Sequence, residues 1–205
     1  MARRTYCARA ENTLSEEVEQ ISGVSEGSVL GPICFVLHIN DLLHIVKNSV
    51  CKMYADDVKL YCIFDDDKSC DGFEADTHEI AIWALKWQLV ISLEKTVIFP
   101  IGRKNSKRVY NLNGVNIISV ISVKDLGIHV SNDLSWRLHC AEVTKRVSKV
   151  ANVILHSFSA HCIDVYMKAF DVYVMPILEY CCFLWSPVYV KDMTMIENVL
   201  RTFTR

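Results

Sequence analysis

Residues 50–62, with the sequence VCKMYADDVKLYC, constrain the fold of this 205-residue chain more than any other stretch. Two short segments of alternating β-branched or aromatic residues flank Ala55, Asp56 and Asp57, which predicts a β-hairpin with an acidic turn. Asp favours turns because its side chain bonds nearby backbone amides. Because adjacent carboxylates repel each other, an exposed pair at the tip favours a bound cation. An ordinary solvated Asp-Asp turn is the alternative that the hairpin alone leaves open.

The composition predicts a globular protein, since 51% of the residues are hydrophobic and 22% are charged. No apolar run reaches the roughly 20 residues of a membrane span, and no apolar core follows the basic N-terminus as a secretory signal requires. The nine cysteines show no Cys-x-x-Cys spacing. We therefore expect reduced core cysteines, no disulfide-linked partner and no membrane contact, in an intracellular protein of the cytoplasm or nucleus that is not secreted.

A second block precedes the hairpin. Residues 23–32 read GVSEGSVLGP, and the apolar segment that follows them ends in the sequence INDL at residues 39–42. Together with the YADD of residues 54–57, this block resembles the central region of the reverse transcriptases of non-LTR (LINE-like) retrotransposons. The order and separation of the blocks agree with that family, and the resemblance runs from about Arg4 to the last residue. It implies an RNA-directed DNA polymerase, a nucleotidyltransferase whose partners are an RNA template, a DNA primer and dNTPs.

The resemblance also implies roles for residues of the hairpin. Two Mg²⁺ ions would serve nucleotidyl transfer, one activating the primer 3′-hydroxyl and one holding the triphosphate. Asp56 is the expected metal ligand and Asp57 the supporting one, while Tyr54 is expected to pack beneath the turn. Lys95 is the candidate cation near the incoming triphosphate, and a lysine at a strand edge is an equally compatible interpretation.

The glycine-rich block is predicted to form a loop that the family places under the templating base and the incoming nucleotide. Gly23 and Gly27 permit positive φ and a close backbone approach, and Ser25 and Ser28 are small donors. The family usually has Pro and Gln where this chain has Ser25 and Glu26. A glutamate replaces a neutral amide donor with a charge that phosphates repel, so we expect altered template handling.

Residues 23–27 also satisfy the Gly-x-Ser-x-Gly pattern of hydrolase nucleophiles. That motif requires a buried strand directly before it. Residues 20–22 make a poor buried strand, so we do not favour hydrolase chemistry.

The remaining patterns predict an α+β fold in which strands precede helices. Asn113-Gly114 is the strongest short hairpin signal, and the acidic residues 65–72 read as a solvated turn. Pro176 is expected to kink or end a helix that starts at Ile163. The other predicted elements are a strand pair in residues 3–22, strands at 108–112 and 115–128, and helices starting at Pro32 and spanning roughly 74–91, 135–158 and 191–203.

We therefore predict a polymerase palm, an antiparallel sheet with packed helices, in residues 1–130, and an all-helical thumb-like region in residues 131–205. In the family, residues 123–128 hold the primer end, and the basic residues at 103–108 and 145–149 fall where template–primer contacts are plausible. The net charge is only −2, so this basic character is local.

The family's third carboxylate belongs to an upstream palm strand, which this sequence lacks together with the fingers region. We therefore expect a truncated and inactive polymerase fragment in which the missing carboxylate weakens Mg²⁺ binding. Two alternatives stay open. The chain could act as a residual nucleic-acid-binding or interaction module without catalysis, or an unpaired sheet edge could make it aggregate.

Overall fold

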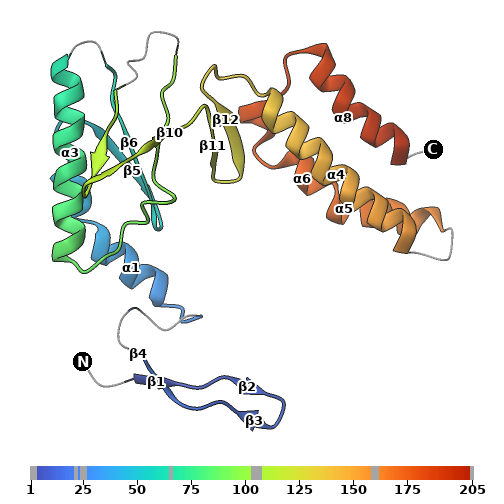
Figure 1. Cartoon of the computed structure of the whole chain (residues 1–205). Helices are drawn as coiled ribbons and strands as arrows, with labels where there is room; N and C mark the ends of the chain where they lie inside the picture. Colours follow the sequence, from blue (N-terminus) through green and yellow to red (C-terminus); the bar gives the residue numbers. More distant parts are fainter. Residues whose placement is uncertain are drawn as a thin grey trace. The chain divides into compact units, whose positions relative to one another are not determined.

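The computed structural model describes residues 4–20, 23, 27–64, 67–102, 108–157 and 162–203. These residues form a mixed α and β fold, which confirms the predicted α+β class (Figure 1). The chain divides into two compact units. The first comprises Met1–Ile91 with Asn111–Gly114, and the second comprises Ser92–Tyr110 with Val115–Arg205. The assignment of residues 1–130 and 131–205 to a palm and a thumb stays a prediction.

The first unit begins with a two-stranded ribbon, as the sequence predicts. Ser15 links the two sides of the ribbon between its strand pairs, because the Ser15 hydroxyl accepts the Ala8 N–H at 2.8 Å and the Ser15 N–H donates to the Ala8 carbonyl at 2.9 Å. The side chains of residues 5–19 are exposed. Backbone hydrogen bonds therefore hold the ribbon, and such isolated hairpins are only marginally stable. Its antiparallel pairs are β1 (Arg4–Tyr6) with β4 (Val18–Gln20), and β2 (Arg9–Ala10) with β3 (Thr13–Leu14).

Helices and a hairpin form the core of the first unit. The predicted helix at Pro32 is confirmed, since Pro32 lies in the first turn of α1 (Gly31–Ile39), where a missing N–H costs nothing. The buried cluster joins α1, α2 (Leu42–Ile45) and α3 (Asp67–Lys86), and Met53 of the following hairpin packs against it. The buried members are Ile39, Leu42, Trp83 and Ala84.

Asp41 fastens α3 to the end of α1. Its two carboxylate oxygens accept the indole N–H groups of Trp83 at 3.0 Å and Trp87 at 3.2 Å. Trp83 is buried, which confirms its predicted place in the core. Val90 is 95% exposed, so its predicted place on the same stripe is wrong. The cause is that α3 ends at Lys86 and Gln88 has a φ of 57°, so the helical stripe cannot continue to residue 91.

The prediction of a solvated acidic turn over residues 65–72 is wrong from Asp67 onward, because α3 begins there. Acidic residues favour the first turn of a helix, where they meet the positive end of the helix dipole. Gly72 is a helical residue beside Asn48: a Cβ added to Gly72 would lie 2.9 Å from the Asn48 Cβ. This glycine therefore serves a close approach between a helix and a loop. Residues 65 and 66 lie outside the described part.

The sheets described are all two-stranded, in contrast to the single antiparallel sheet that the palm prediction implies. In the second unit, β7 (Val97–Ile98) pairs with β10 (Ile118–Ser119) in parallel. Both Asn113 and Gly114 have positive φ, as the predicted tight turn requires. The strands beside that turn, β8 (Asn111–Leu112) and β9 (Val115–Asn116), are shorter than predicted.

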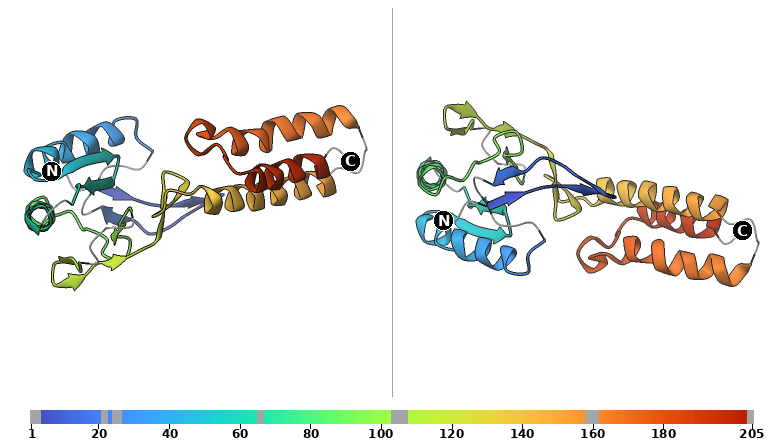
Figure 2. Two further views of the ribbon diagram at one scale, coloured as in Figure 1. Left: turned by 90° about the horizontal axis from the view of Figure 1, so that it is seen from above. Right: turned by 90° about the horizontal axis from the view of Figure 1, so that it is seen from below.

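After residue 131 the described residues form helices and no strands, as the change of period predicts. The helices α5 (Ile163–Tyr173) and α8 (Val190–Phe203) both pack against α4 (Arg137–Ser157), as Figure 2 shows. Pro176 ends the α5 stretch and lies in the first turn of α6 (Met175–Glu179). A short helix, α7 (Cys182–Trp185), follows α6 and precedes α8. None of the helices in the described ranges is long and apolar enough to cross a membrane. The buried core of this bundle includes Val143, Val147, Ala151, Ile154, Phe170, Val174 and Phe203.

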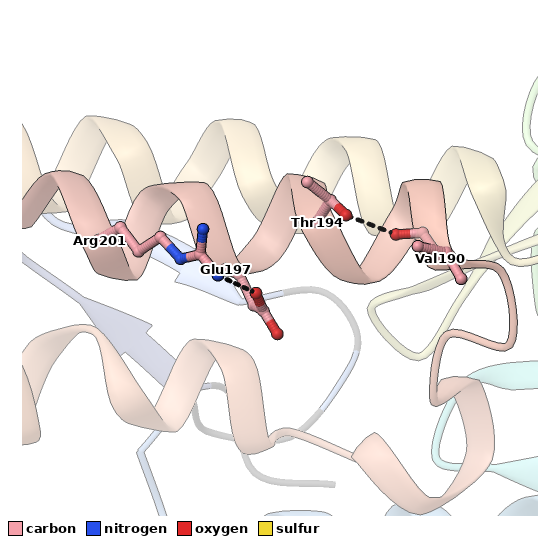
Figure 3. A network of polar contacts seen from close by, with 4 residues as sticks. All are labelled: Val190, Thr194, Glu197 and Arg201. Atoms are coloured by element: carbon pink, nitrogen blue, oxygen red, sulfur yellow. Dashed lines mark hydrogen bonds and ion pairs between the residues drawn. The ribbon is translucent and has the colours of Figure 1, made fainter.

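The outer face of α8 carries polar contacts spaced one turn apart (Figure 3). The Thr194 hydroxyl donates to the Val190 carbonyl at 2.8 Å, and Arg201 pairs with Glu197 at 3.0 Å. An exposed pair of this kind stabilises a helix by only about 0.3–0.5 kcal/mol. Packing of the opposite face therefore holds α8 in place, and that face contains the predicted residues Ile196, Val199, Leu200 and Phe203.

The nine cysteines are all free thiols, as predicted. Their predicted burial holds for Cys70 and Cys140. It is wrong for four exposed cysteines, because each lies on a solvent-facing position of a ribbon, loop or helix. These four are Cys7, Cys34, Cys162 and Cys182.

Candidate functional site

The acidic hairpin forms as predicted from β5 (Val50–Tyr54) and β6 (Asp57–Tyr61). The two strands pair in antiparallel register from Val50 opposite Tyr61 to Tyr54 opposite Asp57. Only Ala55 and Asp56 lie between the strands, and Ala55 has a φ of 51°. Two-residue turns of this kind match the right-handed twist of the strands. Asp56 therefore sits in the turn itself, and Asp57 is the first residue of β6.

The alternation of side chains gives the hairpin two different faces. Residues opposite each other in an antiparallel pair share a face. Met53 pairs with Val58, and Met53 packs against the buried cluster of the first unit. Tyr54 and Asp57 form the next pair, so they lie on the other face together with the Lys52–Lys59 pair.

Both carboxylates at the tip are exposed, as the sequence predicts. Tyr54 is 64% exposed, so the prediction that it packs beneath the turn is wrong. The register explains this difference, because Tyr54 lies opposite Asp57 on the face directed away from the core. An aromatic ring on that face is available to a ligand of the acidic tip.

The base of the hairpin is fixed by a buried carboxylate that the sequence analysis missed. Asp76 is 2% exposed and accepts the backbone N–H groups of Lys47 at 3.1 Å and Asn48 at 2.8 Å, and the Asn48 side-chain amide at 3.1 Å. Burial by itself raises the pKa of Asp76, but these hydrogen bonds outweigh it and hold the pKa below its usual value. A signal was present, because Asp76 has helical spacing from Phe73 and Ile80 and so lies on an apolar face.

The two tip carboxylates are suited to a hard cation, because Mg²⁺ prefers carboxylate oxygen ligands. Asp56 and Asp57 would supply part of such a ligand set. Within the described ranges, no group of three or more His, Cys, Asp or Glu side chains could hold a metal ion.

Of the glycine-rich block, Gly23 and residues 27–32 are described. Gly23 and Gly27 have φ values of 83° and 75°, which confirms the predicted positive φ. No atom lies within 4 Å of a Cβ built on either residue, so backbone conformation and not internal packing requires glycine there. The Ser28 hydroxyl accepts the Gly31 N–H at 3.0 Å, and this hydrogen bond lies at the start of α1. Ser25 and Glu26 lie outside the described residues. Ser25 is also the nucleophile position of the hydrolase pattern.

Lys95 lies in an exposed turn before β7, where its N–H donates to the Ser92 carbonyl at 3.2 Å. It belongs to the second unit, whereas Asp56 and Asp57 belong to the first. Its role beside an incoming triphosphate therefore stays a prediction.

Of the two basic clusters, the one on α4 is described. Lys145, Arg146 and Lys149 are all exposed on this helix. They concentrate three positive charges within five residues, which is a suitable surface for a phosphate backbone. Residues 103–107 of the other cluster lie outside the described part.

Comparison with known proteins defines the class of this chain. The profile of the family described as "Reverse transcriptase (RNA-dependent DNA polymerase)" matches residues 1–130. The chain therefore belongs to the reverse transcriptase family, and the resemblance inferred from the glycine block and the YADD hairpin is confirmed.

Two curated relatives are named as transposon proteins. The chain is 25% identical over 211 residues to the Drosophila melanogaster protein named "Probable RNA-directed DNA polymerase from transposon X-element", which covers 95% of this chain and 23% of the relative. It is 27% identical over 154 residues to the D. melanogaster "Probable RNA-directed DNA polymerase from transposon BS", which covers 70% of this chain and 17% of the relative. The chain thus spans less than a quarter of either relative's length. No solved structure matches the chain significantly.

Proposed function

We propose that this chain carries the metal-binding hairpin of a retroelement RNA-directed DNA polymerase. The observation that supports the proposal best is the pair of exposed carboxylates, Asp56 and Asp57, at a two-residue turn inside the part matched by the family. Asp56 would hold the ion and Asp57 would support it. A bound Mg²⁺ would supply positive charge to neutralise the transferring phosphoryl group and the attacking primer hydroxyl.

The proposed partners are an RNA template, a DNA primer and dNTPs. Gly23 and Gly27 leave open space where a Cβ would stand, which suits contact with a base. Tyr54 offers an exposed ring beside Asp57, on which a base or sugar can pack. Ser25, Glu26 and Ser28 complete the proposed template-binding set, and Lys95 is proposed to face the triphosphate. Because the family resemblance places residues 123–128 at the primer end, the turn at residues 126 and 127 is proposed to contact it.

We further propose that the 205-residue chain by itself does not extend a primer. Two-metal transfer requires carboxylates from more than one strand to gather both ions, and the described residues contain no group of three or more possible ligands that could hold a metal ion. Removing one carboxylate from such a site typically costs orders of magnitude in rate. Polymerase activity would then belong to a longer protein of the kind that this chain resembles.

The second candidate is a nucleic-acid-binding module without catalysis. The exposed Lys145, Arg146 and Lys149 on α4 favour it. Each phosphate contact releases counterions. This surface therefore predicts that the logarithm of the binding constant falls with the logarithm of the salt concentration, with a slope of about −0.9 for each contact.

Fluorescence anisotropy with a labelled DNA primer on an RNA template distinguishes these candidates. The polymerase proposal predicts that Mg²⁺ strengthens binding, and that Asp56→Asn abolishes the Mg²⁺ effect but not the binding. Binding that is independent of Mg²⁺ and lost on Lys145→Gln with Lys149→Gln would favour the second candidate. Absence of any binding at low salt would contradict both. Primer extension by the purified chain with Mg²⁺ and dNTPs would contradict the proposed inactivity.

A further inference from the structure

The turn between β11 (Ser122–Asp125) and β12 (Ile128–Ser131) is held by a tyrosine from the helical region. The Tyr180 hydroxyl donates a hydrogen bond of 2.8 Å to the carbonyl of Leu126. The Tyr180 ring also lies against Gly127, since a Cβ built there would be 3.4 Å from the Tyr180 Cε1. Tyr180 therefore covers both residues of the turn.

The turn has a backbone that needs such support. Leu126 has a φ of 44° and Gly127 a φ of 89°. A positive φ is ordinary for glycine but unfavourable for a leucine, whose Cβ crowds the backbone. Strained residues of this kind persist only when surrounding contacts fix them, and they are frequent at ligand-binding positions. The Leu126 side chain is 41% exposed, so burial of that side chain does not explain the strain.

The backbone of Tyr180 is held by hydrogen bonds at both its N–H and its carbonyl. Its N–H donates to the Pro176 carbonyl at 3.1 Å, which closes α6. Its carbonyl accepts the indole N–H of Trp185 at 2.8 Å, and Trp185 is buried in the core of the helical bundle. Tyr180 thus connects the helical core to the turn.

A second contact holds the same hairpin one residue beyond Ile128, which is buried in the bundle core. His129 donates its backbone N–H to Nδ1 of His139 at 3.2 Å. The His139 ring packs edge-on against Trp185, with ring centroids 4.8 Å apart. Trp185 therefore supports both attachments of the hairpin, and the exposed side of the turn is left for a partner.

We infer that Tyr180 is a positioning residue, which fixes the Leu126–Gly127 turn for contact with the 3′ end of a nucleic-acid primer. The inference rests on the proposed function, in which this turn contacts the primer end. Tyr180 does not touch the primer itself in this account. It determines the orientation of the turn through the Leu126 carbonyl.

The test compares the full chain with Tyr180→Phe, which removes the hydroxyl and keeps the ring against Gly127. Tyr189→Phe is the matched control, because the Tyr189 side chain is 67% exposed in the same helical region. The probe is a primed RNA template that carries the fluorescent base 2-aminopurine either at the primer 3′ end or at an interior position. Amide hydrogen exchange of residues 122–131 is measured on the same proteins without nucleic acid.

We expect Tyr180→Phe to change the fluorescence of the terminal probe and leave the interior probe as in the unaltered chain. Exchange at residues 126–129 should become about fivefold faster, the effect of one lost hydrogen bond. Tyr189→Phe should change neither readout.

Equal terminal fluorescence in the unaltered chain and Tyr180→Phe would overturn the inference while leaving the proposed function intact. If the unaltered chain does not bind the primed template, the proposed function and the primer role of Tyr180 both fail. Unchanged exchange at residues 126–129 in Tyr180→Phe would separately show that Tyr180 does not hold the turn.

Discussion

Asp76 holds Asn48 at two points, accepting its backbone N–H at 2.8 Å and its side-chain amide at 3.1 Å. The same amide nitrogen lies 3.3 Å from the Gly72 carbonyl, one turn earlier on α3. Asn48 is two residues before β5, so α3 fixes the point from which the acidic hairpin starts. The hairpin tip is exposed, but its base is anchored in the protein interior.

Replacement of Asp76 should destabilise the first unit. In Asp76→Ala the N–H groups of Lys47 and Asn48 lose a charged acceptor, and a hydrogen bond to a charged group contributes about 1.5–3 kcal/mol. Chemical denaturation followed by circular dichroism measures the loss. Glu79→Ala, which removes an exposed carboxylate from the same helix, is the control and should change the stability by less than about 0.5 kcal/mol. Equal effects of the two substitutions would contradict the anchoring role.

Gly72→Ala should also destabilise, although alanine favours helices by about 1 kcal/mol over glycine. The added Cβ would lie 2.9 Å from the Asn48 Cβ, so the loop before β5 must move. The same denaturation experiment in the background of Asn48→Gly provides the control. Without the Asn48 Cβ, we expect Gly72→Ala to become neutral or stabilising. A stabilising effect of Gly72→Ala in the unaltered chain would show that the close approach is absent.

Asp41→Ala should leave the buried indole N–H of Trp83 without its acceptor, at a cost of about 1–3 kcal/mol. A double-mutant cycle with Trp83→Phe isolates the contact, because the phenylalanine has no N–H to satisfy. We expect Asp41→Ala to cost less in the Trp83→Phe background. Equal costs in both backgrounds would mean that the hydrogen bond does not stabilise the first unit.

Stability of the helical bundle should fall as the pH decreases from 7.5 toward 5. Burial of His139, together with the nearby His129, lowers the pKa of His139 below its usual value near 6.5. The unfolded chain therefore binds a proton at a higher pH than the folded chain does. The loss starts near the ordinary histidine pKa, continues down to the folded pKa, and is at most about 1.4 kcal/mol per pH unit.

The pH effect is assigned by substitution. His139→Gln should flatten the dependence of the unfolding free energy on pH, whereas His156→Gln, an exposed position on the same helix, should not. Asp192 of α8 is a buried acid in the same bundle, and its charge acts on Cys140, whose pKa is raised first by burial and then by that charge. A pH dependence unchanged in His139→Gln would contradict the assignment of the effect to His139.

Local patterns predicted the elements whose signals are contained in a short segment. The acidic hairpin, the Asn113-Gly114 turn, the positive φ of Gly23 and Gly27, and the helix of residues 190–203 are all confirmed. Each of these depends on turn chemistry or on the spacing of apolar residues, which the sequence shows directly.

The incorrect predictions concern contacts between distant segments. Residues 67–72 were predicted as a turn from their acidic composition, but they are helical and meet Asn48 through Gly72. Tyr54 was expected beneath the turn, but the strand register places it opposite Asp57 on the outer face. Asp76 and Tyr180 escaped notice because their partners lie 28 and 54 residues away in sequence. Such pairings follow from the assembled fold and not from local periodicity.

The central claim is that the tip of the β5–β6 hairpin gathers a divalent cation, and paramagnetic line broadening by Mn²⁺ tests it most directly. Titration of the isotope-labelled chain with substoichiometric Mn²⁺ should selectively broaden the amide signals of residues 55–58, and Asp56→Asn should abolish that broadening. Broadening that is centred elsewhere, for example on the exposed acidic residues 16–19, would contradict the account, as would hairpin signals that stay sharp while Mn²⁺ is added.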